Sequence, residues 1–197
     1  MSKRTHCERC RRPEQFCYCA MISPLDNIWS VHILQHPQES RHALGTARIA
    51  HLGLTRCTLT AGEQLAAGDP ADIALIYPGQ GSQPLSILKD QPPRPLLFLD
   101  ATWRKTRRML FESPALATLP RYALESPPLS RYRIRREPST TALSTLEAIV
   151  YTLGQLEDAH ERYAPLLQVM DSLIEQHIAF MGIDTFTKNY TCNDSVS

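Results

Sequence analysis

The sequence lacks the long apolar segment of a membrane-anchored or secreted protein. No hydrophobic run approaches the roughly 18 residues of a membrane-spanning helix. The chain starts Met-Ser-Lys-Arg-Thr-His-Cys, without the apolar stretch of a signal peptide. Glycine is scarce, at 8 of 197 residues, whereas the 15 prolines favour stiff loops between elements. We therefore expect a cytoplasmic protein without a membrane partner.

The sequence also lacks a large net charge, since its formal net charge is only +1, but its charges are unevenly distributed. Hydrophobic residues make up 43% and charged residues 21%, values that exclude a disordered, collagen-like or coiled-coil chain. Residues 94–136 carry ten Lys or Arg against three acids, whereas residues 157–197 carry seven acids against two bases. The basic segment indicates a polyanionic partner, with an ordinary solvated surface as the alternative.

Four of the six cysteines lie within thirteen residues, as Cys7, Cys10, Cys17 and Cys19. In a reducing compartment, closely spaced thiols more often hold a metal than form disulfides. Four thiolates complete a tetrahedral shell, so the spacing predicts a structural zinc in a small knuckle over residues 1–24. An iron–sulfur cluster or a redox dithiol is the alternative, and His6 is a possible replacement for one thiolate.

Strand and helix patterns alternate along the rest of the chain. Alternation predicts a strand at 28–34, and short apolar runs that end in turn or polar residues predict buried parallel strands at 73–77 and 96–99. Weaker strands are predicted at 57–60 and 121–124. Helical spacing predicts helices over 40–54, 143–153 and 166–181, with Pro165 opening the last. This alternation predicts an α/β fold with a mostly parallel sheet flanked by helices.

Ligands of such sheets bind at the carboxyl ends of the strands. In this sequence the segments at those ends are 36–39, 77–82 and 100–103. Asp100 directly follows a buried strand, and a helix rich in Arg and Lys begins just after it. A carboxylate, the indole of Trp103 and cations for phosphates thus occur within nine residues. A helix N-cap is the alternative role for Asp100.

These segments together resemble the DTW-domain family, and the resemblance covers almost the whole chain. It rests on the cysteine cluster, on His36-Pro37-Gln38-Glu39, on Tyr77-Pro78-Gly79, on Leu99-Asp100-Ala101-Thr102-Trp103, and on Arg135-x-x-Pro138 followed by Leu143-Ser144-Thr145-Leu146-Glu147-Ala148. The naming motif is interrupted here as Asp-Ala-Thr-Trp, and Gly45-Thr46 stands where many members have Asn-Thr. The resemblance implies a catalytic domain over 25–185 and a tail over 186–197. The core of the catalytic domain would be SPOUT-like, either with or without the knot of that class.

The resemblance further implies a tRNA-uridine aminocarboxypropyltransferase. Such an enzyme transfers the 3-amino-3-carboxypropyl group of S-adenosylmethionine to N3 of a tRNA uridine and releases methylthioadenosine. Asp100 would be the general base, because uridine N3 is a poor nucleophile while protonated, and Trp103 would orient the uracil. The cofactor contacts implied are Tyr77, Pro78, Gly79, Leu99, Thr141, Leu143, Ser144 and Thr145. Ser144 with Glu147 also fits a capping box, which is the alternative for its hydroxyl.

The basic clusters predict an RNA-binding surface formed by Arg104, Lys105, Arg107, Arg108, Arg133 and Arg135. The expected partners are tRNA and S-adenosylmethionine, for a monomer or weak homodimer. Two alternatives stay open: a SPOUT-type RNA methyltransferase that uses the same cofactor, and a non-catalytic zinc-knuckle RNA-binding protein.

Overall fold

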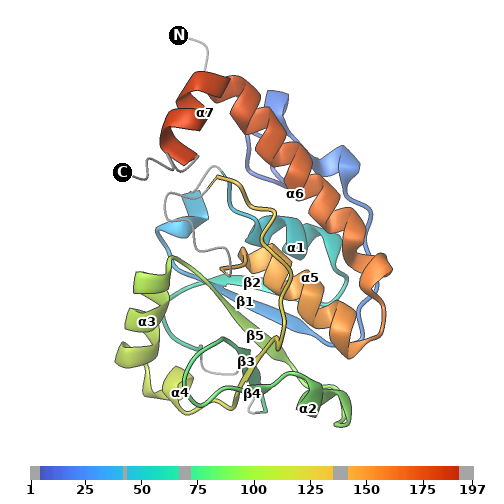
Figure 1. The fold of residues 1–197 in the computed structure, drawn as a ribbon, viewed down its shortest axis with the longest axis vertical. Helices are drawn as coiled ribbons and strands as arrows, with labels where there is room; N and C mark the ends of the chain where they lie inside the picture. Colours follow the sequence, from blue (N-terminus) through green and yellow to red (C-terminus); the bar gives the residue numbers. More distant parts are fainter. Residues whose placement is uncertain (1–4, 42–43, 67–71, 135–141, 191–197) are drawn as a thin grey trace, which may run out of the picture.

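The chain folds around one six-stranded sheet in which every strand pair is parallel. The structure is a computed structural model that describes residues 5–41, 44–66, 72–134 and 142–190. The spatial order is β2-β1-β5-β3-β6-β4, with β5 near the middle (Figure 1). The strands are β1 (Val31–Gln35), β2 (Cys57–Ala61), β3 (Ala74–Ile76), β4 (Gln83–Pro84), β5 (Leu96–Asp100) and β6 (Arg121–Ala123). The prediction of an α/β fold with a parallel sheet is confirmed.

Helices cover both faces of the sheet (Figure 1). One side carries α1 (Ala47–Gly53), α5 (Thr145–Leu156) and α6 (His160–Met181), and α7 (Ile183–Tyr190) follows α6. The other side carries α3 (Trp103–Glu112) and α4 (Pro114–Ala117), while the short α2 (Ser86–Lys89) contacts α5. No helix in these described ranges is long and apolar enough to cross a membrane.

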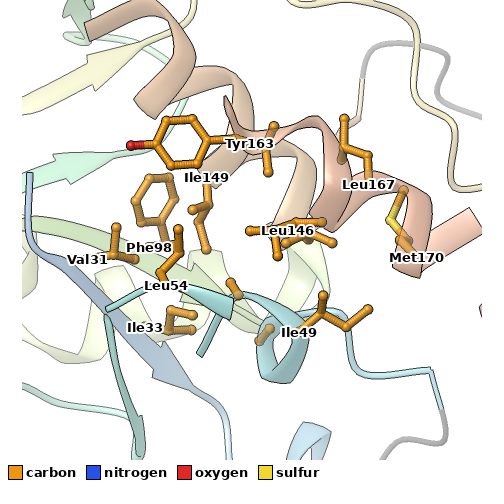
Figure 2. Packing of buried hydrophobic residues seen from close by; sticks show 14 of the residues in the cluster. Val31, Ile33, Ile49, Leu54, Phe98, Leu146, Ile149, Tyr163, Leu167 and Met170 are labelled. Carbon is orange, nitrogen blue, oxygen red and sulfur yellow. The ribbon is translucent and has the colours of Figure 1, made fainter. Parts of the chain in front are cut away.

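The central strand β5 is apolar from Leu96 to Leu99 because successive side chains enter different cores. Leu97 packs toward α3 and α4, whereas Phe98 packs into the larger core under α5 and α6. Figure 2 shows Phe98 in this larger core, near Ile149 of α5 and Tyr163 of α6. Burial on both faces therefore explains why the strand at 96–99 was predictable from an apolar run that does not alternate.

The N-terminal knuckle packs against the body of the protein. Two short 3₁₀ turns, Glu14–Phe16 and Cys19–Met21, follow its first cysteines. Phe16 meets Phe180 of α6 edge to face, with ring centroids 5.5 Å apart. Cys10 and Tyr18 are buried in the same core as α5 and α6. The division into 1–24, 25–185 and 186–197 stays a prediction.

Three sequence-based expectations about helices were wrong in detail. The helix expected over 40–54 is a 3₁₀ turn at Glu39–Arg41 and a separate α1 that begins at Ala47. Pro165 does not open α6 but lies inside it, since the helix begins at His160 and already buries Tyr163. Because Pro165 lies near the start of α6 and has no backbone N–H, it removes only one helical hydrogen bond, the one to the carbonyl of residue 161. The prediction also missed α7, which follows Gly182 at a φ of +85°.

Candidate functional site

The three predicted strand-end segments lie at one edge of the sheet. The register places Gln35 of β1 beside Asp100 of β5, and β3 adjoins β5 on its other side. The amide of Tyr77, just past β3, donates to the carbonyl of Tyr122 in β6. Parallel pairing therefore brings residues 36–39, 77–82 and 100–103 to the same edge, although they are far apart in the sequence.

Two neutral side chains hold the carboxylate of Asp100. Gln35 Nε2 donates to Oδ2 at 2.7 Å, and Thr145 Oγ1 donates to Oδ1 at 2.6 Å. The first donor comes from the neighbouring strand and the second from the first residue of α5. Because each carboxylate oxygen accepts one hydrogen bond, the two donors fix the orientation of the carboxylate.

Asp100 does not cap the helix that follows it, so that alternative is wrong. The N-cap of α3 is Thr102, whose hydroxyl accepts from the amide of Lys105 at 3.4 Å. Asp100 is instead the last residue of β5, and its carboxylate faces β1 and α5. Its side chain therefore belongs to the sheet edge and not to the start of α3.

Sequence analysis missed Gln35, the residue of β1 that contacts Asp100. Gln35 is 5% exposed, and a buried amide requires hydrogen-bond partners. Its signal in the sequence was a polar residue directly after the apolar pair Ile33 and Leu34. Thr145 was expected to contact the cofactor, and its hydroxyl lies on Asp100.

A cavity of about 620 Å³ lies beside this centre, between the β3 loop and α3. Its walls include four residues expected in the site, Tyr77, Pro78, Gly79 and Trp103, together with Arg107 of the expected RNA surface. The rings of Tyr77 and Trp103 meet edge to face with centroids 5.5 Å apart, and Trp103 is 42% exposed. Asp100 is not among the lining residues, so the aromatic cavity and the carboxylate are neighbouring parts of the edge.

The entrance of α5 is a capping box, as the alternative interpretation of Ser144 predicted. The Ser144 hydroxyl accepts from the amide of Glu147, and the Glu147 carboxylate accepts from the amide of Ser144 at 2.7 Å. Glu147 is fully buried and also accepts from Ser130 and from the amide of Arg131. Leu143 is half-buried beside this turn, and the cofactor roles of Leu143 and Ser144 stay predictions. Thr141 lies outside the described residues.

The expected RNA-binding cations differ in their surroundings. Arg104 and Arg107 are exposed on α3 and have no acidic partner among the residues that the structure describes. Lys105 pairs with Glu39 at 2.6 Å, and Arg108 pairs with Glu112 at 2.7 Å.

Acids of the C-terminal region approach the basic loop before α5. Arg131 pairs with Asp171, and Arg133 pairs with Glu175, both acids being on α6. The acidic segment thus neutralises part of the basic one, a pairing that the separate charge counts did not predict. Arg135 lies outside the described residues.

The four clustered cysteines converge on one point. All four sulfur atoms lie within 4.8 Å of one another, and the Cys7–Cys19 and Cys10–Cys17 pairs are each 3.7 Å apart. A tetrahedral ion with metal–sulfur bonds of about 2.3 Å places its ligands about 3.8 Å apart. The cluster therefore fits one metal ion, and His6 is not part of it.

The pKa values of the cluster thiols shift in opposite directions. Hydrogen bonds from the backbone of Cys10 and the side chain of Cys17 lower the pKa of Cys7 to about 6. Burial raises the pKa of Cys19 to about 12. Without a cation the four sulfurs would not all be thiolates at neutral pH, so a bound divalent ion would supply the missing charge compensation.

Comparison with known proteins identifies similar proteins in animals and plants. A family model described as the DTW domain matches residues 4–178. The Drosophila melanogaster protein named tRNA-uridine aminocarboxypropyltransferase 2 is 29% identical, over 96% of this chain and 81% of its own length. The Mus musculus protein of that name is 27% identical over 87% of this chain and 63% of its own length.

A plant relative extends this similarity. The Arabidopsis thaliana protein named tRNA-uridine aminocarboxypropyltransferase A is 27% identical, over 87% of this chain and 80% of its own length. No solved structure matches the chain significantly. The family model spans most of the chain, including the cysteine cluster and the Asp100 edge, and on this evidence the chain belongs to the DTW-domain family.

Proposed function

We propose that this protein transfers the 3-amino-3-carboxypropyl group of S-adenosylmethionine to N3 of a uridine in tRNA. The observation that carries the proposal is the match of nearly the whole chain to relatives named for this activity in fly, mouse and plant. The oriented carboxylate of Asp100 at the sheet edge supplies the proton acceptor that the reaction needs.

The reaction begins with the loss of a proton from uridine N3 to the Asp100 carboxylate. The freed electron pair of N3 attacks the γ-carbon of the methionine part, forming the N–C bond. The bond from that carbon to sulfur breaks, and its electron pair neutralises the sulfonium as methylthioadenosine leaves. Because the sulfonium is already a good leaving group, the task left to the protein is to hold carbon and nitrogen in line.

The residues at the edge divide this task between them. Gln35 and Thr145 hold Asp100 in one orientation, so that the carboxylate meets the substrate without rearranging. Trp103 and Tyr77 form an aromatic corner against which a uracil ring can pack. Leu99 and the backbone of Pro78 and Gly79 would contact S-adenosylmethionine.

The remaining parts of the proposal concern the metal and the surroundings. Zinc is the ion that we assign to Cys7, Cys10, Cys17 and Cys19, with a structural role since four thiolates leave no open position. We assign the core to the SPOUT class and the protein to the cytoplasm. Arg104 and Arg107 are the α3 cations best placed to meet RNA, because no described acid pairs with them.

Label transfer tests the function directly. When the protein is incubated with unmodified tRNA, the tRNA should incorporate label from the carboxyl carbon of S-adenosylmethionine and none from its methyl group. Incorporation of the methyl label would identify a methyltransferase instead. Binding of tRNA with transfer of neither label would identify a non-catalytic RNA-binding protein.

A further inference from the structure

A second cavity, of about 350 Å³, lies where the knuckle meets the body of the protein. Its walls come from the knuckle, the loop after β1, the start of α1 and the C-terminal end of α6. Its size falls in the range of ligand pockets, roughly 300–1,000 Å³. Cys10 of the cysteine cluster and Glu39 of the predicted strand-end segment 36–39 line it, whereas Asp100, Trp103 and the residues of the 77–82 segment do not.

Three arginines in its wall distinguish this cavity. Arg11, Arg12 and Arg48 all line it, and none of them forms an ion pair with an acid of the described ranges. The one carboxylate in its wall, Glu39, is already paired with Lys105. The cavity therefore favours an anion.

Arg12 is held in place but lacks partners. Its guanidinium lies over the ring of Tyr18, with the central carbon 5.9 Å from the ring centroid. Its Nε and Nη1 atoms are shielded from solvent and have no hydrogen-bond partner within the described chain. Buried donors without a partner destabilise the folded state, and an anionic acceptor would offset that cost.

An exposed aromatic ring stands at the same cavity. Phe180 of α6 lines it while 71% exposed, and its edge-to-face contact with Phe16 orients the ring. Aromatic faces next to arginines are the usual combination for single-stranded RNA, in which a base stacks while its phosphate meets a cation.

The cavity also adjoins the proposed reaction centre. Gln35 lies in its wall and donates to the Asp100 carboxylate at 2.7 Å. A ligand in this cavity would thus be one side chain away from the proposed base.

We propose that this cavity binds a nucleotide of the tRNA, with its phosphate on Arg12 and Arg48 and its base against Phe180. The proposal rests on the proposed function only in taking tRNA as the substrate. S-adenosylmethionine fits the cavity less well, because it carries an ammonium and a sulfonium against one carboxylate, and a cluster of arginines repels both cations. A polyanionic strand carries no such penalty.

The test measures binding of unmodified tRNA, without turnover, across a series of salt concentrations. The main variant is Arg48→Gln, which lies in α1 outside the knuckle, and Arg12→Gln and Phe180→Leu complete the set. The matched control is Arg9→Gln, which removes the same charge from an exposed position of the knuckle that does not line the cavity.

We expect Arg48→Gln to weaken tRNA binding roughly tenfold and to reduce the salt slope by about one, with metal content and S-adenosylmethionine affinity unchanged. The control should change tRNA affinity less than twofold. Equal losses in Arg48→Gln and Arg9→Gln would overturn the proposal in favour of a general basic surface. A loss of S-adenosylmethionine affinity with tRNA binding intact would overturn it in favour of a cofactor pocket.

This result is independent of the transfer assay. If the parent protein binds tRNA through the cavity but transfers no label, the proposed activity fails and the cavity assignment stands. If label is transferred while the cavity variants bind tRNA like the parent, the activity stands and the cavity assignment fails.

Discussion

Replacing Asp100 by Asn tests whether its carboxylate takes up the uridine proton. The amide has the same shape, and its oxygen can still accept from Gln35. The Thr145 hydroxyl can rotate to accept from the new NH₂ group, so both contacts survive in altered form. Because the two hydrogen bonds would no longer involve a charged carboxylate, the free energy of unfolding should fall by about 1–2 kcal/mol.

The effect on chemistry should be much larger. Asn does not accept a proton at neutral pH, and loss of a general base lowers rates by ~10²–10⁴. At 1.36 kcal/mol for each factor of ten, this corresponds to about 2.7–5.4 kcal/mol of activation free energy. The measurement is the single-turnover rate at saturating tRNA and S-adenosylmethionine, together with a melting curve.

The matched control is Thr102→Ala, which removes the real N-cap of α3. We expect it to lose about 1 kcal/mol of stability while its rate stays near that of the parent. A stable Asp100→Asn variant that turns over like the parent would refute the assignment of the base. So would a Thr102→Ala variant whose rate falls as far as that of Asp100→Asn, because structural disturbance alone would then explain both losses.

Three further predictions concern stability, metal and RNA. Gly154→Ala should destabilise the protein by about 1–3 kcal/mol in denaturant unfolding despite the better helix propensity of Ala, because the new Cβ would lie 2.6 Å from the His160 ring and 3.2 Å from its Cα; a stabilised variant would contradict this. Cys10→Ser should lose the bound metal in elemental analysis, whereas Cys57→Ser, whose thiol has a pKa raised by burial to about 12, should retain it; equal metal content in both would refute the site. Arg104→Gln should reduce the salt slope of tRNA binding by about one without changing cofactor affinity, and an unchanged slope would make this arginine ordinary surface.

Much of the fold was predictable because the signals were local. The run at 96–99 is apolar at every position, and that pattern followed from helices on both faces of the sheet. The spacing of Ser144 and Glu147 predicted the helix start that the structure has. Clustered cysteines likewise pointed to one metal site without any knowledge of the tertiary structure.

The parts that escaped prediction depend on contacts between distant segments. Gln35 and Asp100 are 65 residues apart, and only the strand order of the sheet places them side by side. The pairing of Arg133 with Glu175 of α6 depends in the same way on how a loop crosses a helix. No local pattern encodes such contacts. For this reason the cations of the expected RNA surface are indistinguishable in the sequence, whereas in the structure some of them pair with acids and others do not.

The central claim is that Asp100 and its surroundings transfer an aminocarboxypropyl group to uridine. Its most direct test is mass analysis of nucleosides from tRNA that has been incubated with the protein and S-adenosylmethionine labelled in the carboxyl carbon. The account predicts a labelled uridine derivative that carries the whole aminocarboxypropyl group, together with one methylthioadenosine released per modified uridine. A methylated nucleoside with S-adenosylhomocysteine as the product, or tRNA that stays unmodified, would contradict it.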